Sequence, residues 1–394
     1  MRKLFLSIIA LTLGIGAWAQ ETQSVNYIDA DGQQKTVTAT VVTDETETLS
    51  AGWYVVTGEV SRGSITCNGD VHLILADGAK LTATGDKTSK TPGVQVSGEG
   101  NSLTIYGQSA QSGQLIANGG EYAAGIGGGY QSSGSNITIN GGTVTSTGGK
   151  YAAGIGGGKE GSGSNITING GTVTANGGIL GAGIGGGDNS SGSNITINGG
   201  KVTANGGNGG AGIGGGAYAS GSNITINGGM IDAKGGEYGG AGIGGGDKGS
   251  GSNIKVATTL AIYADNNDPP TTEILHASDY DISLYLNGKR YALVKDVITG
   301  LKSDAIAAIN AAISDTDTDN VKAIAANAET AINAATSIHE IDAIKTQALA
   351  AIASAKAILG PLGTEHPGPA VKVTKGDTEV ILYLPDKVEY IIRK

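Results

Sequence analysis

One segment of the chain is repeated five times between Gly119 and Val256. The copies share Ser-Asn-Ile, a Thr-Val-Thr-like run and Ala-Gly-Ile-Gly-Gly-Gly, and equivalent residues are 29 or 30 positions apart. A fixed period of this length is typical of solenoids, in which each copy forms one turn. Because a single turn cannot bury its apolar side chains alone, neighbouring turns must stack to make a core.

Each copy contains three short runs that alternate apolar and polar residues, as strands do. Ile137 and Ile139 face inward in the first run, Val144 in the second, and Ala124 with Ile126 in the third. The predicted fold is therefore mainly β: a three-sided right-handed parallel β-helix filled by ladders of aliphatic residues. The ladder of the third run is Ile126, Ile155, Ile184, Ile213 and Ile243.

Glycine ends each of these runs. Seventy glycines in 394 residues would otherwise indicate a disordered chain. Their fixed phase with isoleucine and valine indicates order instead, since glycine adopts the positive φ that sharp corners need.

Asparagine also recurs in register, which allows two interpretations. Asn136-Ile137-Thr138 and its copies match the N-glycosylation triplet. Stacked asparagines can alternatively bond to the backbone and to their copies in the next turn. We favour this structural ladder, formed by Asn136, Asn165, Asn194 and Asn223.

The pattern continues upstream in degenerate form, through Gly52-Trp53-Tyr54-Val55-Val56 and Ser102-Leu103-Thr104-Ile105-Tyr106-Gly107. Together with Leu73–Leu81 and the repeated Ala-Gly-Ile-Gly-Gly-Gly, this succession resembles the right-handed parallel β-helix region of surface proteins from gut and other anaerobic bacteria. Such regions are labelled adhesin-like or carbohydrate-binding. The resemblance covers residues 52–264, with regular turns at 119–256, and it supplies no set of ligand residues.

The first residues predict export. Met1-Arg2-Lys3 is charged, Leu4–Gly16 is apolar, and Ala17-Trp18-Ala19 resembles a cleavage site, so we expect a Sec signal peptide at 1–19. The apolar run is shorter than the ~20 residues of a spanning helix, and no transmembrane segment is expected. We expect an extracellular or cell-surface protein, with the periplasm as the alternative. Residues 20–51 are expected to form an N-terminal strand segment.

The composition changes after Val256. Residues 265–300 are predicted to form a β cap, with a hairpin turn at Asn287-Gly288 between two alternating runs. Alanine and isoleucine at helical spacing predict a three-helix bundle at 301–359, with Ser303 capping its first helix and Ser337 with Glu340 capping its third. The bundle resembles the alanine-rich three-helix modules of bacterial surface proteins. Residues 360–394 again alternate like strands.

Charge and motifs disfavour several functions. The net charge of −10 disfavours nucleic acid and acidic polysaccharides as partners. Gly181–Gly186 fits a dinucleotide-binding pattern but precedes no predicted helix.

We expect no cofactor and no metal site, an isolated calcium ion excepted, because Asp188 and Asp247 do not belong to a column of carboxylates. The single cysteine, Cys67, is expected to be a buried apolar residue.

Paired titratable groups of the kind that catalysis needs are not found on one predicted face, so we expect no enzyme. A polysaccharide lyase or hydrolase is the alternative. The candidate ligand-binding residues are tyrosines near glycine-rich loops, whose rings suit sugar stacking, although for each tyrosine taken alone we favour a role in covering an edge of the solenoid. The sequence thus predicts a structural rod or adhesin that binds glycans or host matrix proteins through Tyr122, Tyr130, Tyr151, Tyr218 and Tyr238.

Overall fold

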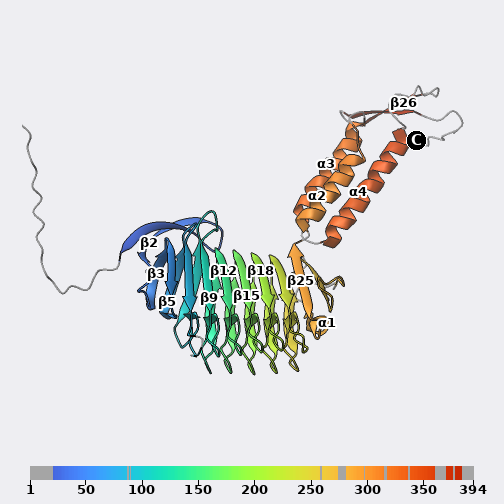
Figure 1. Ribbon diagram of the computed structural model, residues 1–394. Helices are drawn as coiled ribbons and strands as arrows, with labels where there is room; N and C mark the ends of the chain where they lie inside the picture. The colour runs from blue at the N-terminus through green and yellow to red at the C-terminus, as the bar shows by residue number, and fades with distance from the viewer. Residues whose placement is uncertain are drawn as a thin grey trace, which may run out of the picture.

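The computed structural model describes residues 21–383 except 87, 89, 258–259, 274–280, 297, 315–316, 336–337, 360–369 and 376–377. The expected signal peptide, Ser337 and the last eleven residues lie outside the described residues. A parallel β-solenoid occupies most of the described chain, and three helices follow it (Figure 1). The structure confirms the predicted fold class.

Three strands per turn form the three faces of the solenoid, and all pairs between regular turns are parallel and in register. The first face contains β8 (Ser102–Gly107), β11 (Gly134–Ile139), β14 (Gly163–Ile168), β17 (Gly192–Ile197), β20 (Gly221–Ile226) and β23 (Gly251–Val256). The second contains β4 (Glu59–Arg62), β6 (Lys80–Thr84), β9 (Gln114–Asn118), β12 (Thr143–Thr147), β15 (Thr172–Asn176), β18 (Lys201–Asn205) and β21 (Met230–Lys234).

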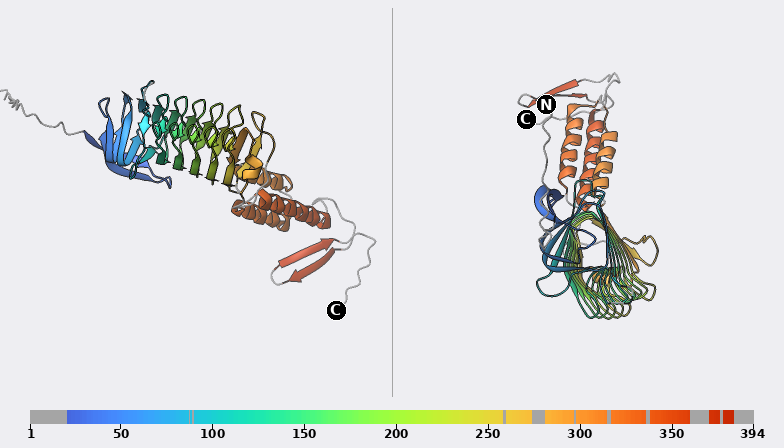
Figure 2. Two further views of the ribbon diagram at one scale, coloured as in Figure 1. Left: turned by 90° about the horizontal axis from the view of Figure 1, so that it is seen from below. Right: turned by 60° about the vertical axis from the view of Figure 1, so that its left-hand side comes forward.

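The third face is built from two-residue strands, and all but the first are Ile-Gly: β7 (Val94–Gln95), β10 (Ile126–Gly127), β13 (Ile155–Gly156), β16 (Ile184–Gly185), β19 (Ile213–Gly214) and β22 (Ile243–Gly244). Near the N-terminal end the long strand β5 (Ile65–Leu75) pairs with both β7 and β8 and so joins this face to the first. Figure 2 shows the turns superposed when the solenoid is viewed from its N-terminal side.

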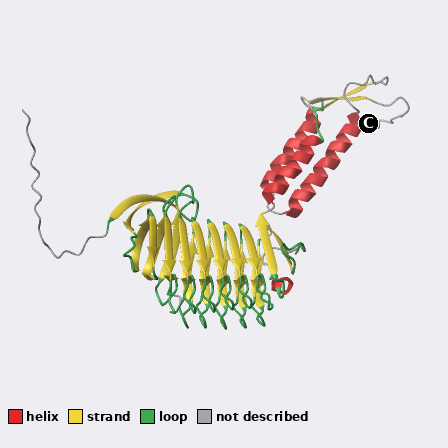
Figure 3. Ribbon diagram, in the orientation of Figure 1, coloured by secondary structure: helices red, strands yellow, loops and turns green. Residues whose placement is uncertain are grey.

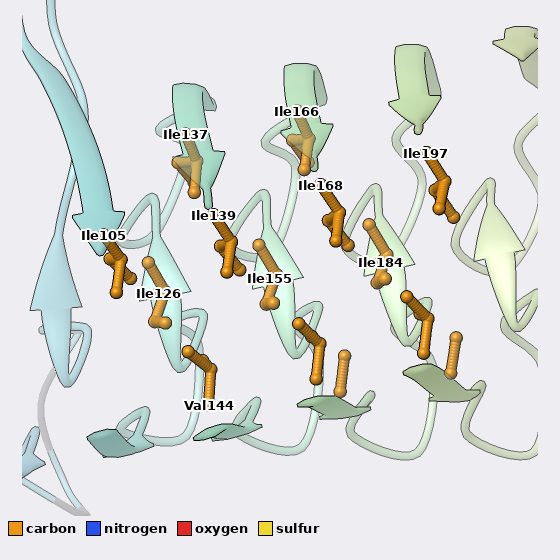
Figure 4. Close-up of a cluster of buried hydrophobic side chains, with 14 of the residues drawn as sticks. Ile105, Ile126, Ile137, Ile139, Val144, Ile155, Ile166, Ile168, Ile184 and Ile197 are labelled. Atoms are coloured by element: carbon orange, nitrogen blue, oxygen red, sulfur yellow. The ribbon is translucent and has the colours of Figure 1, made fainter. Parts of the chain in front are cut away.

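The core is a set of aliphatic ladders along the solenoid axis. Ile137, Ile139, Val144 and Ile155 are fully buried, as are their copies in the next turns, and their side chains point into the coil (Figure 4). Burying an aliphatic side chain of this size contributes about 1.5–3 kcal/mol. Every turn therefore adds several such contributions, and each depends on the turn beside it.

An N-terminal hairpin covers the outside of the first turns. β1 (Thr22–Ile28) and β2 (Gln34–Val41) pair antiparallel, and β2 also pairs with the end of β3 (Thr48–Val56). Val25 and Ala39 pack on Val55 and Ile74. The side chains of Val55 and Ile74 point out of the coil, whereas those of their neighbours point into it, so without the hairpin they would face water. The sequence predicted a strand in this region but not its return as a hairpin.

The C-terminal end of the solenoid is closed by an antiparallel strand. β25 (Tyr291–Asp296) lies between β21 and β24 (Leu260–Asp265) and pairs antiparallel with both. The predicted hairpin turn at Asn287-Gly288 is wrong, because the preceding run folds as a short helix, α1 (Ser283–Leu286). Ser283 is buried there and its hydroxyl accepts a bond from the Ile254 amide, which fixes the helical turn against the last coil.

The helices that follow have a core of their own. α2 (Ile298–Ala311), α3 (Asp319–Ala334) and α4 (Ile338–Leu359) bury Ile309, Ile332 and Ile352 against one another. Ser303 does not cap the first helix, since α2 begins five residues earlier. Beyond the helices, β26 (Ala370–Lys375) and β27 (Thr378–Tyr383) pair antiparallel.

Candidate ligand-binding edge

Two loops of each turn lie side by side and form what we call the loop edge. One loop precedes the third-face strand and the other follows it; Figure 3 shows the loops in green, repeated along the solenoid. Backbone bonds join them between turns, as the Lys159 amide donates to the Tyr122 carbonyl and the Asp188 amide to the Tyr151 carbonyl. Loop residues are thus held in columns like the strand residues.

Close stacking of these loops depends on glycine. A Cβ on Gly178 would lie 1.7 Å from the Gly149 carbonyl oxygen, and one on Gly149 would lie 1.7 Å from that of Gly120. No side chain fits at such distances without a backbone shift. The Gly-Gly pairs therefore bring successive loops together, and the residues after them project outward.

All five predicted tyrosines lie on the loop edge, and three of them touch. The rings of Tyr122 and Tyr151 are nearly parallel, at 8° with centroids 5.3 Å apart. Tyr130 meets Tyr122 edge-on at 5.7 Å and 71°. Three ammonium groups surround these rings: Lys90 Nζ is 4.0 Å from the Tyr130 centroid, and Lys150 Nζ and Lys159 Nζ are each 5.0 Å from that of Tyr151.

The other two tyrosines stand free of this group. Tyr238 is 65% exposed, and its amide bonds to the Asn208 carbonyl, which places it in the same column as Tyr122 and Tyr151. Tyr218 is 53% exposed and has a φ of 61°, a left-handed conformation that is uncommon for a bulky side chain. Equivalent positions in the other regular turns hold Gln131, Glu160, Asn189 and Lys248, all with positive φ.

A buried carboxylate lies beneath the same loops. Asp188 is 5% exposed and its Oδ1 has no hydrogen-bond partner. Burial raises the pKa of this carboxyl group, and nearby Glu160 acts in the same direction while Lys159 opposes it. Glu160 accepts a hydrogen bond from Gln131 at 2.9 Å and lies 3.9 Å from Lys159 Nζ.

The asparagine columns are structural. Asn136 has a φ of 57° within β11, where it interrupts the pairing register with β14, and the Asn165 side-chain amide donates to Asn136 Oδ1 at 3.3 Å. The same bond links the later turns through Asn194, Asn223 and Asn253. A second column, outside the predicted ladder, is bonded at 2.7–2.8 Å through Asn140, Asn169, Asn198 and Asn227.

A second polar cluster lies under the N-terminal hairpin, and the sequence did not indicate it. His72 stacks on Trp53 at 4.3 Å, with Nδ1 3.2 Å from the Tyr106 hydroxyl and Nε2 3.2 Å from Asp70. Burial raises the pKa of Tyr106 to about 12. Both imidazole nitrogens are engaged and one ring face is covered by Trp53, so this cluster holds the outer surface of the first turns together under the hairpin.

A cavity of about 150 Å³ adjoins this hairpin. Its lining includes Asn26, Asp77 and Gln108. Gln108 accepts from the Asp77 amide and donates to the Asn26 carbonyl, so these groups join the hairpin to the first turns. Their hydrogen-bonding capacity is largely used within the protein.

Among the described residues, no group of three or more His, Cys, Asp or Glu side chains is arranged to hold a metal ion. In the same part of the chain, no helix combines the length and apolar character needed to cross a bilayer.

Comparison with known proteins agrees with the geometry. A model of the beta helix repeat matches residues 112–130, 137–159, 166–188, 195–217 and 224–247. The chain is a parallel β-helix protein. No curated protein and no solved structure matches it. The β-helix match covers the regular turns, where strands and loop columns repeat.

Proposed function

We propose that this β-helix protein is a secreted or surface-displayed, non-enzymatic rod that binds glycans through its loop edge. The observation that carries the proposal is the placement of Tyr218. An exposed aromatic ring occupies a left-handed backbone position that polar residues fill in the neighbouring turns. The coil imposes this φ in every regular turn, so the feature that points to a ligand is the choice of a bulky, exposed ring where the other turns have polar side chains.

Tyr238 supports the same function from the adjoining turn. Aromatic rings beside polar loops can stack on the apolar faces of sugars, and the side chains of Tyr218 and Tyr238 are both more than half exposed. Lys248 Nζ lies 5.1 Å from the Tyr218 centroid and adds a donor for sugar hydroxyls. The rigid solenoid holds these groups in place, so little ordering entropy opposes binding.

A glycan array with residues 20–394 tests this function. We expect bound glycans, and loss of most of the signal when Tyr218→Asn and Tyr238→Ser are combined. Tyr285→Ser is the matched control, since Tyr285 is 49% exposed on α1 of the C-terminal cap and does not belong to the columns of the loop edge. An empty array, equal loss in the control, or release of sugar ends at a catalytic rate would each contradict the proposal.

Export is tested separately. Protease added to intact cells should degrade the protein while a cytoplasmic marker survives. Protection in intact cells, with digestion only after the envelope is opened, would place the rod in the periplasm and would contradict surface display.

A further inference from the structure

The lysine–tyrosine cluster, defined as Tyr122, Tyr130 and Tyr151 with Lys90, Lys150 and Lys159, differs in chemistry from the exposed tyrosines. Its two parallel rings are 5.3 Å apart, which leaves no room for a sugar ring between them. Tyr130 contacts Tyr122 edge-on. Sugar stacking is therefore a poor use of this cluster, and its accessible groups are hydrogen-bond donors.

Three ammonium groups and the phenol hydroxyls supply these donors. A hydrogen bond to Tyr151 raises the pKa of Lys150, which keeps that group charged at neutral pH. Lys159 Nζ lies 5.0 Å from one ring and 5.9 Å from the other. Rings beneath the ammonium groups attract them and favour a small set of positions, so less freedom is lost on binding.

Carboxylates near the cluster do not neutralise it. Among the residues that the structure describes, Lys159 is the one lysine of the three with an ion pair within 4 Å, to Glu160. That pair is 3.9 Å long and partly exposed, and such pairs contribute little. Glu121 acts on Lys150 from a greater distance. Asp188 is buried beneath the loops and, within the described part of the chain, forms no ion pair within 4 Å with these lysines.

We propose that the lysine–tyrosine cluster binds an anionic substituent of a glycan, a carboxylate or a sulfate. This inference rests on the proposed function and narrows its ligand class. Overall negative charge disfavours a long polyanion along the rod, but a local group of three cations on rigid loops attracts a single anionic group. The sequence had disfavoured acidic polysaccharides from net charge alone, and the distribution of charge revises that expectation.

The test compares three polymers with one neutral backbone: dextran, dextran sulfate and carboxymethyl-dextran. Binding of residues 20–394 is measured at near-physiological salt by biolayer interferometry. We expect binding to at least one anionic polymer and at least tenfold weaker binding to dextran. The two anionic arms distinguish sulfate from carboxylate.

Variants locate the site. Lys150→Gln with Lys159→Gln should weaken anionic binding at least tenfold, and Tyr151→Phe, which keeps the ring, should weaken it by a smaller factor. Lys201→Gln with Lys255→Gln is the control, because these lysines lie on β18 and β23, away from the loop edge. Equal loss in the control would overturn the inference, as would equal binding of all three polymers.

The inference and the proposed function fail in different ways. Neutral glycans that bind through Tyr218 with no effect of the lysine variants would leave the function standing and overturn the anionic site. Lysine-dependent binding of dextran sulfate, with no glycan bound in a way that depends on Tyr218 or Tyr238, would support the anionic site and overturn the proposed binding through those two tyrosines.

Discussion

At the scale of residues, one position in each regular turn needs a residue that both adopts a positive φ and bonds to the next turn. The asparagines of the first column have φ between 49° and 57°, and their amides also bond from turn to turn. Asparagine is enriched among residues that adopt the left-handed conformation. Its amide supplies one donor and one acceptor along the axis, so it meets both demands.

Substitutions at Asn194 separate these demands. Asn194→Ala should lower the free energy of unfolding by about 3–4 kcal/mol, from about 1–2 for the backbone and about 1 for each lost hydrogen bond. Asn194→Gly keeps the backbone conformation and should cost less. Chemical denaturation followed by circular dichroism measures both, and equal losses would show that φ is not the limiting factor.

The columns of asparagine and isoleucine could be predicted from the sequence because identical residues recur at a fixed period. Contacts between side chains of different loops could not be predicted in this way. Tyr238 belongs to the column of Tyr122 and Tyr151 at the same 29-residue spacing, but the sequence does not show that only the first two rings stack, because Leu180 and Gly209 separate Tyr238 from them. Lys90 could not be assigned to the tyrosine cluster, since it comes from the irregular turn before the repeats.

Asp188 gives a pH-dependent prediction. Its pKa is raised in the folded state, so the unfolded chain loses the proton first and stability falls as pH rises past the ordinary Asp value. Asp188→Asn should therefore stabilise the protein at pH 7, and the gain should vanish near pH 3, where both states of the wild type are protonated. Unfolding midpoints at the two pH values measure this.

Asp232→Asn is the control for that comparison. Asp232 is exposed on β21, and its substitution should change the midpoint little at either pH. A gain for Asp188→Asn that is the same at both pH values would contradict the electrostatic explanation.

At the scale of elements, the ends of the solenoid require the most explanation. Parallel strands stacked along an axis leave unpaired backbone groups at each end, and such edges promote association with other chains. β25 closes one end by pairing antiparallel with β21. The change of direction stops the parallel repeat, so no further turn can add in register.

Val294→Pro tests the cap. Val294 is fully buried and pairs with both Ile231 and Ile262, and proline in a central strand removes a ladder hydrogen bond. We expect β25 to detach and the protein to form oligomers, detected by size-exclusion chromatography with light scattering. Val294→Ala loses side-chain volume but keeps the amide, and it should stay monodisperse.

The predicted hairpin at the cap failed for a physical reason. Asn287-Gly288 is a strong turn signal, but Asn287 Oδ1 instead accepts a bond from the Gly251 amide in the last coil. Tertiary contacts overrode the local pattern. The N-terminal hairpin was missed because its partner surface, formed by Val55 and Ile74, exists only once the coil has folded.

At the scale of the whole molecule, the chain contains separate cores. The aliphatic ladders of the solenoid form one cluster, and the three helices form another with no residue in common. Periodicity predicted both, since a change from strand-like to helical spacing marks the boundary in the sequence. Two cores of different architecture need not unfold together.

Reciprocal substitutions test this independence. Ile332 in α3 and Ile231 in β21 are both fully buried, and replacing either by alanine should cost its own core about 2–5 kcal/mol. Hydrogen exchange with mass spectrometry should show faster exchange in the helices alone for Ile332→Ala, and in the solenoid alone for Ile231→Ala. Exchange that rises in both parts for either variant would show that the two cores unfold as one unit. The rod would then owe its stability to the helices as well as to its own ladders.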